Sequence, residues 1–293
     1  MPPEVLGDLG YLPEKQNRIE SLSLITGAGC IWNVDGQSSV VLSEFKCLRR
    51  MFWKGLRSVE DFEALRDCLQ AKSEHLDELE LDLINWVEAD DAWLTNYGRR
   101  NGGRSENFFA WDTLKLAARE SRITFPSLEA LSLSALSLQS AMDELACAFN
   151  ISGLRSLKLH NCLYSSALLE ATVDSSQAIK PTSLELVVDE EDECFGLRAV
   201  SRCLEAFEGL QNLYILIHNP EDITHSYWHS ILHHRLTLKR LVYHERSTNL
   251  DEDADRSELS CDDELSGASG MYSLSHEPGL ESIGICGTLS DMV

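Results

Sequence analysis

The chain has 293 residues, of which 43% are apolar, and this fraction suffices for a continuous core and excludes global disorder. Carboxylates outnumber basic side chains by 48 to 25, which gives a formal net charge of −23. Nucleic-acid binders and proteins that dock on anionic membranes both rely on clustered Lys and Arg. The charge therefore argues against both kinds of partner.

The sequence lacks the features that direct a chain into or across a membrane. No apolar run approaches the roughly 20 residues that span a bilayer, and the N-terminal stretch lacks the basic-then-apolar layout of a secretory signal. Nine scattered cysteines form no C-x-x-C pair, which is typical of reduced thiols in an intracellular protein. We expect a cytoplasmic or nuclear protein.

Residues 1–18 are predicted to form a linker or N-terminal cap, and a repeat begins directly after them. The apolar pattern L-x-x-L-x-L, with some substitutes, occurs nine times between residues 19 and 285. Its middle residues are Leu22, Met51, Leu79, Leu131, Leu157, Leu184, Leu213, Leu241 and Ile283. Successive steps are 29, 28, 52, 26, 27, 29, 28 and 42 residues, and we interpret 52 as two periods with one copy overwritten. Such a period predicts a repeat architecture over residues 19–293, as a single domain.

Residues 154–180 show how one repeat is built. Leu157 and Leu159 alternate with Lys158 and His160, which predicts a strand with one apolar face. Helical spacing follows through Ala167, Leu168, Leu169 and Val173.

Two further repeats show the same change from strand to helical spacing. Ser58–Asp61 forms a possible capping box before Phe62, Leu65 and Leu69, and Leu197, Val200, Leu204 and Phe207 form a similar stripe. Each unit offers one strand and one helix, and stacking gives neighbouring units a continuous core. The predicted fold class is α/β, a curved solenoid with parallel strands on the concave face and helices on the convex face.

These units resemble leucine-rich repeats of the longer, helix-containing class found in ribonuclease-inhibitor-like and F-box-associated proteins. Residues 48–56 (LRRMFWKGL), 76–83 (LDELELDL) and 232–245 (LHHRLTLKRLVYHE) are similar to the repeat region of fungal F-box-like proteins. That resemblance implies a non-enzymatic adaptor with ubiquitin-ligase components among its partners. The stretch from Pro3 to Pro13 resembles the head of an F-box, but the repeat begins before a complete F-box could form.

Two insertions interrupt the repeat. The first, at about 84–125, contains Trp86, Trp93, Trp111 and a Gly-rich basic tip at 99–104, and residues 111–121 have helical spacing. We expect either an ordered excursion that packs on the repeats or a loop that binds a partner.

The second insertion, at 249–279, carries eight carboxylates and one Arg between residues 251 and 264, which predicts disorder. Alternating Asp251, Asp253 and Asp255 leave calcium binding as an alternative, although the Gly and the closing Glu of the twelve-residue loop are absent.

Catalytic and metal-binding motifs are weak in this chain. His225, His229 and His233 are spaced i, i+4, i+8 on a predicted helix, which leaves an adventitious metal site as a distant alternative to solvated histidines. No nucleophile elbow, phosphate loop or dinucleotide fingerprint occurs. The most plausible thiols, Cys162 and Cys203, occupy positions that the repeat itself explains. We expect neither an enzyme nor a cofactor.

The residues that alternate with the buried strand positions should point from the concave face. Near the N-terminal end, basic Arg50 and Lys54 lie beside acidic Glu78, Glu80 and Asp82, and these strands could simply pair with each other. Farther along, apolar side chains occupy positions that should be polar, and basic side chains border them. The predicted partner-binding residues are Lys158, His160, Val187, Tyr214, Leu216, Arg240, Val242 and His244.

An exposed apolar patch rimmed by charge is typical of a protein-binding surface. The sequence therefore predicts a scaffold that holds a protein partner on residues 158–244, and the resemblance implies a role as the substrate-recognition part of an F-box-type ubiquitin ligase. Two alternatives stay open: an inserted loop of the same chain covers the patch, or the repeats are a structural or sensor segment of a larger multidomain protein.

Overall fold

The computed structural model describes residues 18–26, 41–56, 59–83, 109–116, 122–138, 142–175, 179–189, 196–218, 226–246, 274 and 277–286. The chain divides into two compact units, Met1–Leu154 and Arg155–Val293. Each unit is described by itself below. Most of residues 1–18 and of the insertions 84–125 and 249–279 lies outside the described residues, as do the acidic run 251–264 and Ser58 of the capping box.

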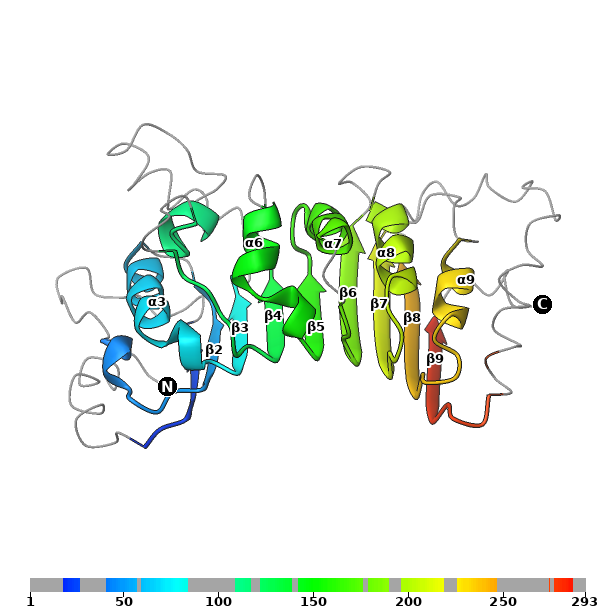
Figure 1. Cartoon of the computed structure of the whole chain (residues 1–293), viewed down its shortest axis with the longest axis horizontal. Helices are drawn as coiled ribbons and strands as arrows, with labels where there is room; N and C mark the ends of the chain where they lie inside the picture. Colours follow the sequence, from blue (N-terminus) through cyan, green and yellow to red (C-terminus); the bar gives the residue numbers. More distant parts are fainter. Residues whose placement is uncertain are drawn as a thin grey trace. The chain divides into compact units, whose positions relative to one another are not determined.

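The first unit contains four parallel strands that pair in chain order (Figure 1). They are β1 (Ser21–Ile25), β2 (Arg50–Lys54), β3 (Glu78–Asp82) and β4 (Ala130–Ser134). Its longer helices are α3 (Val59–Lys72) and α6 (Met142–Ala148), and a π-helical turn, η5, spans Phe109–Thr113. The described residues of this unit also contain three short 3-10 turns: η2 (Leu42–Glu44), η3 (Ser73–His75) and η6 (Ile151–Gly153).

The second unit contains five parallel strands, which also pair in chain order. They are β5 (Ser156–His160), β6 (Ser183–Asp189), β7 (Asn212–His218), β8 (Arg240–Arg246) and β9 (Ser282–Cys286). The intervening helices are α7 (Ser165–Asp174), α8 (Gly196–Glu205) and α9 (Ser226–Leu232).

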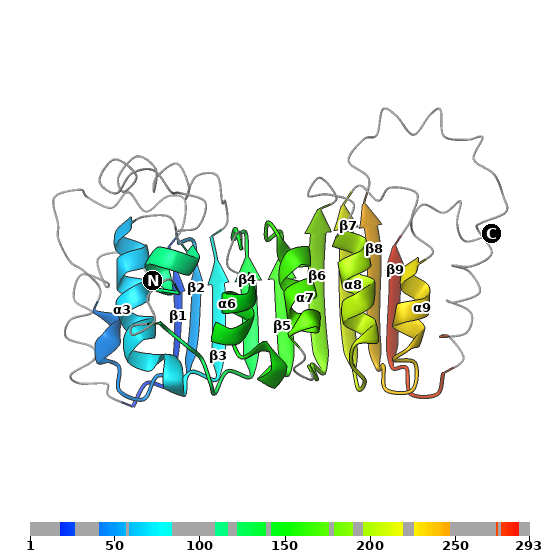
Figure 2. The ribbon, with the colours of Figure 1, turned by 45° about the horizontal axis from the view of Figure 1, so that its top comes forward.

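In each unit the helices lie on one face of the strands, as both views show (Figures 1 and 2). In the second unit, α8 packs between α7 and α9. The opposite face of β5–β9 carries no helix of the described residues, and we call it the open face. The predicted α/β class, with parallel strands that alternate with helices, is confirmed.

The buried repeat positions stack across neighbouring strands. Leu157, Leu184 and Leu213 are direct partners in register, and the row continues to Leu241 and Ile283. The first four are at most 4% exposed, whereas Ile283 of β9 is 42% exposed. In the first unit Leu22, Met51, Leu79 and Leu131 form the corresponding row. Removing these rows from water is the main stabilising contribution that the pattern makes.

A paired backbone hydrogen bond fixes the register at the start of nearly every strand. The carbonyl of Thr182, just before β6, accepts bonds from the amides of Gln211 at 2.9 Å and Asn212 at 3.0 Å. Two consecutive amides of the following repeat bond one carbonyl in the same way at six other positions: Glu20, Arg49, Asp77, Arg155, Gln211 and Lys239. A slip by one residue would break these pairs and turn every apolar side chain to the wrong face.

Left-handed residues turn the chain away from the strand ends. Gly55, Ala135 and Asn161 directly follow β2, β4 and β5, and their φ angles are 88°, 54° and 49°. In the repeat that begins with β5, the buried Cys162 comes next, and its Sγ lies 3.6 Å from the carbonyl oxygen of His160. The thiol thus satisfies a backbone acceptor at the turn, in keeping with the position that the repeat pattern gives it.

Where their side chains are described, which excludes Leu197, the helices present the predicted apolar stripes except in part of α7. Phe62, Leu65 and Leu69 of α3 are at most 1% exposed. In α7 the buried residue of the last turns is Thr172, at 3% exposed, while Val173 is only half-buried. The Thr172 hydroxyl donates to the carbonyl of Leu168 at 2.7 Å, so a polar side chain occupies the core position without an unsatisfied group.

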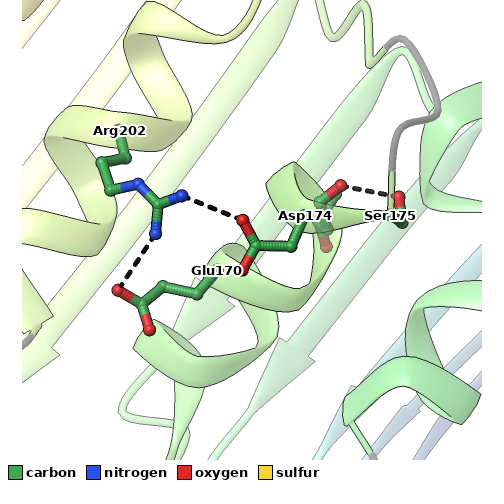
Figure 3. A network of polar contacts seen from close by, with 5 residues as sticks. Glu170, Asp174, Ser175 and Arg202 are labelled. Carbon is green, nitrogen blue, oxygen red and sulfur yellow. Dashed lines mark hydrogen bonds and ion pairs between the residues drawn. The ribbon is translucent and has the colours of Figure 1, made fainter.

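An ion-pair network links two helices on the covered side (Figure 3). Arg202 of α8 reaches α7, with its Nη2 at 2.9 Å from Asp174 and its Nη1 at 3.6 Å from Glu170. Because Arg202 and both carboxylates are substantially exposed, the network contributes little to stability. It helps to align α8 on α7.

The first insertion places no strand between β3 and β4 in the sheet. Leu79 of β3 and Leu131 of β4 are direct partners although 52 residues separate them. The ladder passes directly from β3 to β4, which agrees with the interpretation that the insertion overwrites one copy of the repeat.

The described part of the first insertion packs against the first unit. Phe109, Leu114 and Ile123 are at most 3% exposed, and the ring of Phe125 stacks on that of Phe149 at 5.2 Å. The helix predicted over 111–121 is instead the single π-helical turn of η5, with residues 117–121 outside the described part. Where it is described, the insertion is an ordered excursion. Trp86, Trp93 and the basic tip at 99–104 lie outside the described residues.

We expect the stacked rows to dominate stability. Leu213→Ala removes a side chain that is 2% exposed from the centre of the second unit and should cost about 2–5 kcal/mol of unfolding free energy, measured by urea denaturation. Leu236→Ala makes the same chemical change at a side chain that is 80% exposed and should cost less than about 0.5 kcal/mol. Equal effects of the two substitutions would contradict the stacking.

Candidate functional site

All eight predicted partner-binding residues belong to the second unit and lie on its open face. Within each strand they alternate with core positions, so β7 has the pattern of half-buried Tyr214 and Leu216 between buried Leu213, Ile215 and Ile217. The register arranges them in two neighbouring rows across the sheet. One row is Lys158, Glu185, Tyr214, Val242 and Gly284; the next is His160, Val187, Leu216, His244 and Cys286.

The apolar members of these rows form one patch. Tyr214 is the register partner of Val242, and Val187 is the register partner of Leu216. Tyr214, Leu216 and Val242 are half-buried, while Val187 is 9% exposed. Val187 therefore forms the floor of the patch and offers little contact area of its own.

The two basic residues at the β5 border are already paired, which the sequence did not reveal. Nζ of Lys158 lies 2.9 Å from Oε2 of Glu185, and Nε2 of His160 lies 3.0 Å from Oε1 of the same carboxylate, though not in hydrogen-bond geometry. Glu185 thus sits between the border and the apolar patch. In the sequence, Glu185 stands between the core residues Leu184 and Leu186, and this alternation indicates that it lies on the open face.

Arg240 at the other border is held loosely. Its side chain is 67% exposed, and its Nε lies 3.9 Å from Oε2 of Glu281, which is itself 58% exposed. An ion pair of this length between exposed groups contributes little to stability. His244 is half-buried, between Leu216 and Cys286 in register.

The first unit's strands show the pairing that the sequence left open. Nζ of Lys54 on β2 lies 3.1 Å from Asp82 on β3, and Nε of Arg49 lies 3.1 Å from Asp77 just before that strand. At these two positions, basic side chains at β2 pair with acidic side chains at β3.

The histidines of α9 do not form a metal centre with any described residue. His229 on α9 and His233 directly after it are exposed, whereas Trp228 and Ile231 are buried, and His225 lies outside the described residues. In the described part of the chain, no three His, Cys, Asp or Glu side chains are grouped closely enough to hold a metal ion.

A different histidine, His234, has a structural role that the sequence reasoning missed. It is 2% exposed, and its Nε2 donates to the carbonyl of Leu204 at 2.8 Å. That carbonyl belongs to the last turn of α8, where helix acceptors lack intrahelical partners. Burial lowers the pKa of His234 below its ordinary value of 6.5, and nearby His233 acts in the same direction, although the Leu204 bond and Glu208 oppose them. The ring is therefore held neutral.

This burial predicts a specific pH dependence of stability. The pKa of His234 is lower in the folded than in the unfolded state. The contribution of its neutral ring to the unfolding free energy is therefore complete above about pH 6.5 and declines as the pH falls toward the folded pKa. We expect His234→Gln, which cannot titrate, to lose less unfolding free energy than the wild type between about pH 7 and about pH 5. Urea denaturation at these two pH values measures the loss of unfolding free energy. The control His229→Gln, at an exposed position of α9, should lose as much unfolding free energy as the wild type. An equal loss for His234→Gln would contradict the proposal that burial of His234 causes this pH dependence.

The two cysteines weighed as nucleophiles lie in the core. Cys162 and Cys203 are buried at 5% and 3% exposed. Burial raises the pKa of Cys203 to about 12, so it stays a thiol at neutral pH, and the pKa of Cys68 is raised to about 12 for the same reason.

Comparison of the chain with protein-family models, with curated proteins and with solved structures found no match. Within the described residues, no helix has the length and apolar character needed to cross a membrane.

Proposed function

We propose that this chain is a non-enzymatic interaction scaffold that binds a protein partner on the open face of its second unit. The contact surface consists of Tyr214, Leu216 and Val242 over the floor of Val187, with Arg240 and His244 at one border and the Lys158–Glu185–His160 cluster at the other. The partner is a macromolecule with its own apolar contact surface.

The observation that supports this proposal best is the continuity of the apolar patch. Three half-buried apolar side chains on two adjacent strands are brought together by the register, on a face that no described helix covers. Neighbouring strands are about 4.8 Å apart, so these side chains touch a partner as one surface. Tyr and Arg are the residues that most often dominate protein interfaces, and both occur here.

The repeat architecture supports the same proposal. In-register strand–helix units of 27 to 29 residues are consistent with leucine-rich repeats, which present the open strand face to ligands. The resemblance to F-box-like proteins extends the proposal to a substrate-recognition role in a ubiquitin ligase. That role rests on the sequence resemblance alone and requires a ligase-binding module.

The double variant Tyr214→Ala/Arg240→Ala should remove partner binding. Hot-spot losses are not additive, and a loss of about 2 kcal/mol in total already weakens binding about 30-fold, so much less partner should be recovered in quantitative affinity purification. Leu236→Ala/Arg235→Ala changes an exposed apolar residue and an exposed Arg near the end of α9 and serves as the control. If every protein recovered with the wild type is recovered equally with the folded Tyr214/Arg240 variant, the open face is not the binding site.

A further inference from the structure

Within the described residues, one position of the open face beside its apolar patch carries no side chain. Gly284 of β9 is the register partner of Val242, where the other strands of that row carry Lys158, Glu185 and Tyr214. A Cβ placed on Gly284 would stand 3.7 and 4.0 Å from the two methyl groups of Val242, so this position borders that side chain directly. A glycine within a strand often marks a place where another chain approaches closely. We call the space over Gly284, bounded by Val242, Ser282 and Cys286, the Gly284 notch.

An accessible basic side chain lies beside the notch. Arg240 lies two residues before Val242 on β8 and on the same face, and the loose 3.9 Å contact with exposed Glu281 leaves its guanidinium accessible. Lys158, by contrast, is held at 2.9 Å by Glu185. Of these two basic groups, Arg240 is therefore the better placed to take a carboxylate from outside.

We propose, building on the function above, that the partner supplies an extended acidic segment with the motif Asp/Glu-x-apolar. Its apolar side chain enters the Gly284 notch against Val242, and its carboxylate displaces Glu281 and pairs with Arg240. The spacing supports this motif: Arg240 and Val242 are separated by two strand residues, about 6.6 Å, which equals the distance between alternate side chains of an extended segment. Guanidinium–carboxylate pairing is bidentate and directional, so it fixes the orientation of the segment.

Four single variants test this geometry. Gly284→Val fills the notch without strain, because no atom would lie within 3.4 Å of the new Cβ and the backbone is not left-handed. Arg240→Glu reverses the charge, while Glu281→Gln removes the competing carboxylate. Arg235→Glu is the matched control, since Nε of Arg235 also lies 3.9 Å from a glutamate, Glu277, outside the open face.

The measurement uses random peptides displayed on phage and selected on the wild-type chain, followed by titration of a synthetic selected peptide and of its Asp→Lys counterpart. We expect selected peptides to share the acid-x-apolar motif. Gly284→Val and Arg240→Glu should each weaken binding at least about tenfold, Glu281→Gln should strengthen it about two- to fivefold, and Arg235→Glu should leave it unchanged. The Asp→Lys peptide should bind at least about tenfold more weakly.

The outcomes separate this inference from the proposed function. Peptides that depend on Tyr214 but lack an acid, or that bind Gly284→Val and Arg240→Glu normally, would overturn the inference and leave the interaction surface intact. If no selected peptide depends on Tyr214, both proposals fail. Stronger competition by a synthetic peptide of this chain's own residues 251–265 than by any selected peptide would assign the notch to the chain itself, and would also overturn the inference.

Discussion

The paired hydrogen bond that precedes most of the strands is the constraint on which the rest of the structure depends. One carbonyl, such as that of Thr182, receives the two successive amides of Gln211 and Asn212, and the next repeat begins at a fixed position relative to the last. With the register fixed, Leu157, Leu184 and Leu213 become direct partners and lose their contact with water together. Hydrogen bonding thus sets the geometry, while burial of the leucine rows provides most of the stability.

The same register creates the candidate binding surface. Alternation places every second strand residue opposite the helices, and residues far apart in the sequence, such as Tyr214 and Val242, become neighbours. The face is not uniform: at β5 and β6 its charges are satisfied internally by Glu185, whereas at β8 and β9 Arg240 is only loosely engaged and Gly284 leaves a space. The orientation that we propose for a bound partner segment rests on this asymmetry.

Repeat periodicity predicts strands and their facing reliably, because burial of Leu157 and Leu159 and exposure of Lys158 follow directly from alternation. It predicts contacts across insertions poorly: the spacing between Leu79 and Leu131 could not show that these strands are adjacent. Side-chain pairing is equally hidden, since the Glu185 contacts depend on rotamers and register together. His234 was missed for a related reason, because its partner is a backbone carbonyl thirty residues away, which no local pattern reports. Thr172 took a core position that apolar periodicity assigns to Val173, because its hydroxyl bonds within its own helix.

The most direct test of the account is a measurement of methyl–methyl nuclear Overhauser effects in a leucine-labelled, otherwise deuterated chain. The stacked row predicts strong cross-peaks from Leu213 to Leu184 and to Leu241, its partners on the neighbouring strands. Leu184 and Leu241 are two strand spacings apart, about 10 Å, so their mutual cross-peak should be much weaker. Absence of both strong cross-peaks from Leu213, or their replacement by contacts to leucines outside this row, would contradict the register and remove the surface derived from it.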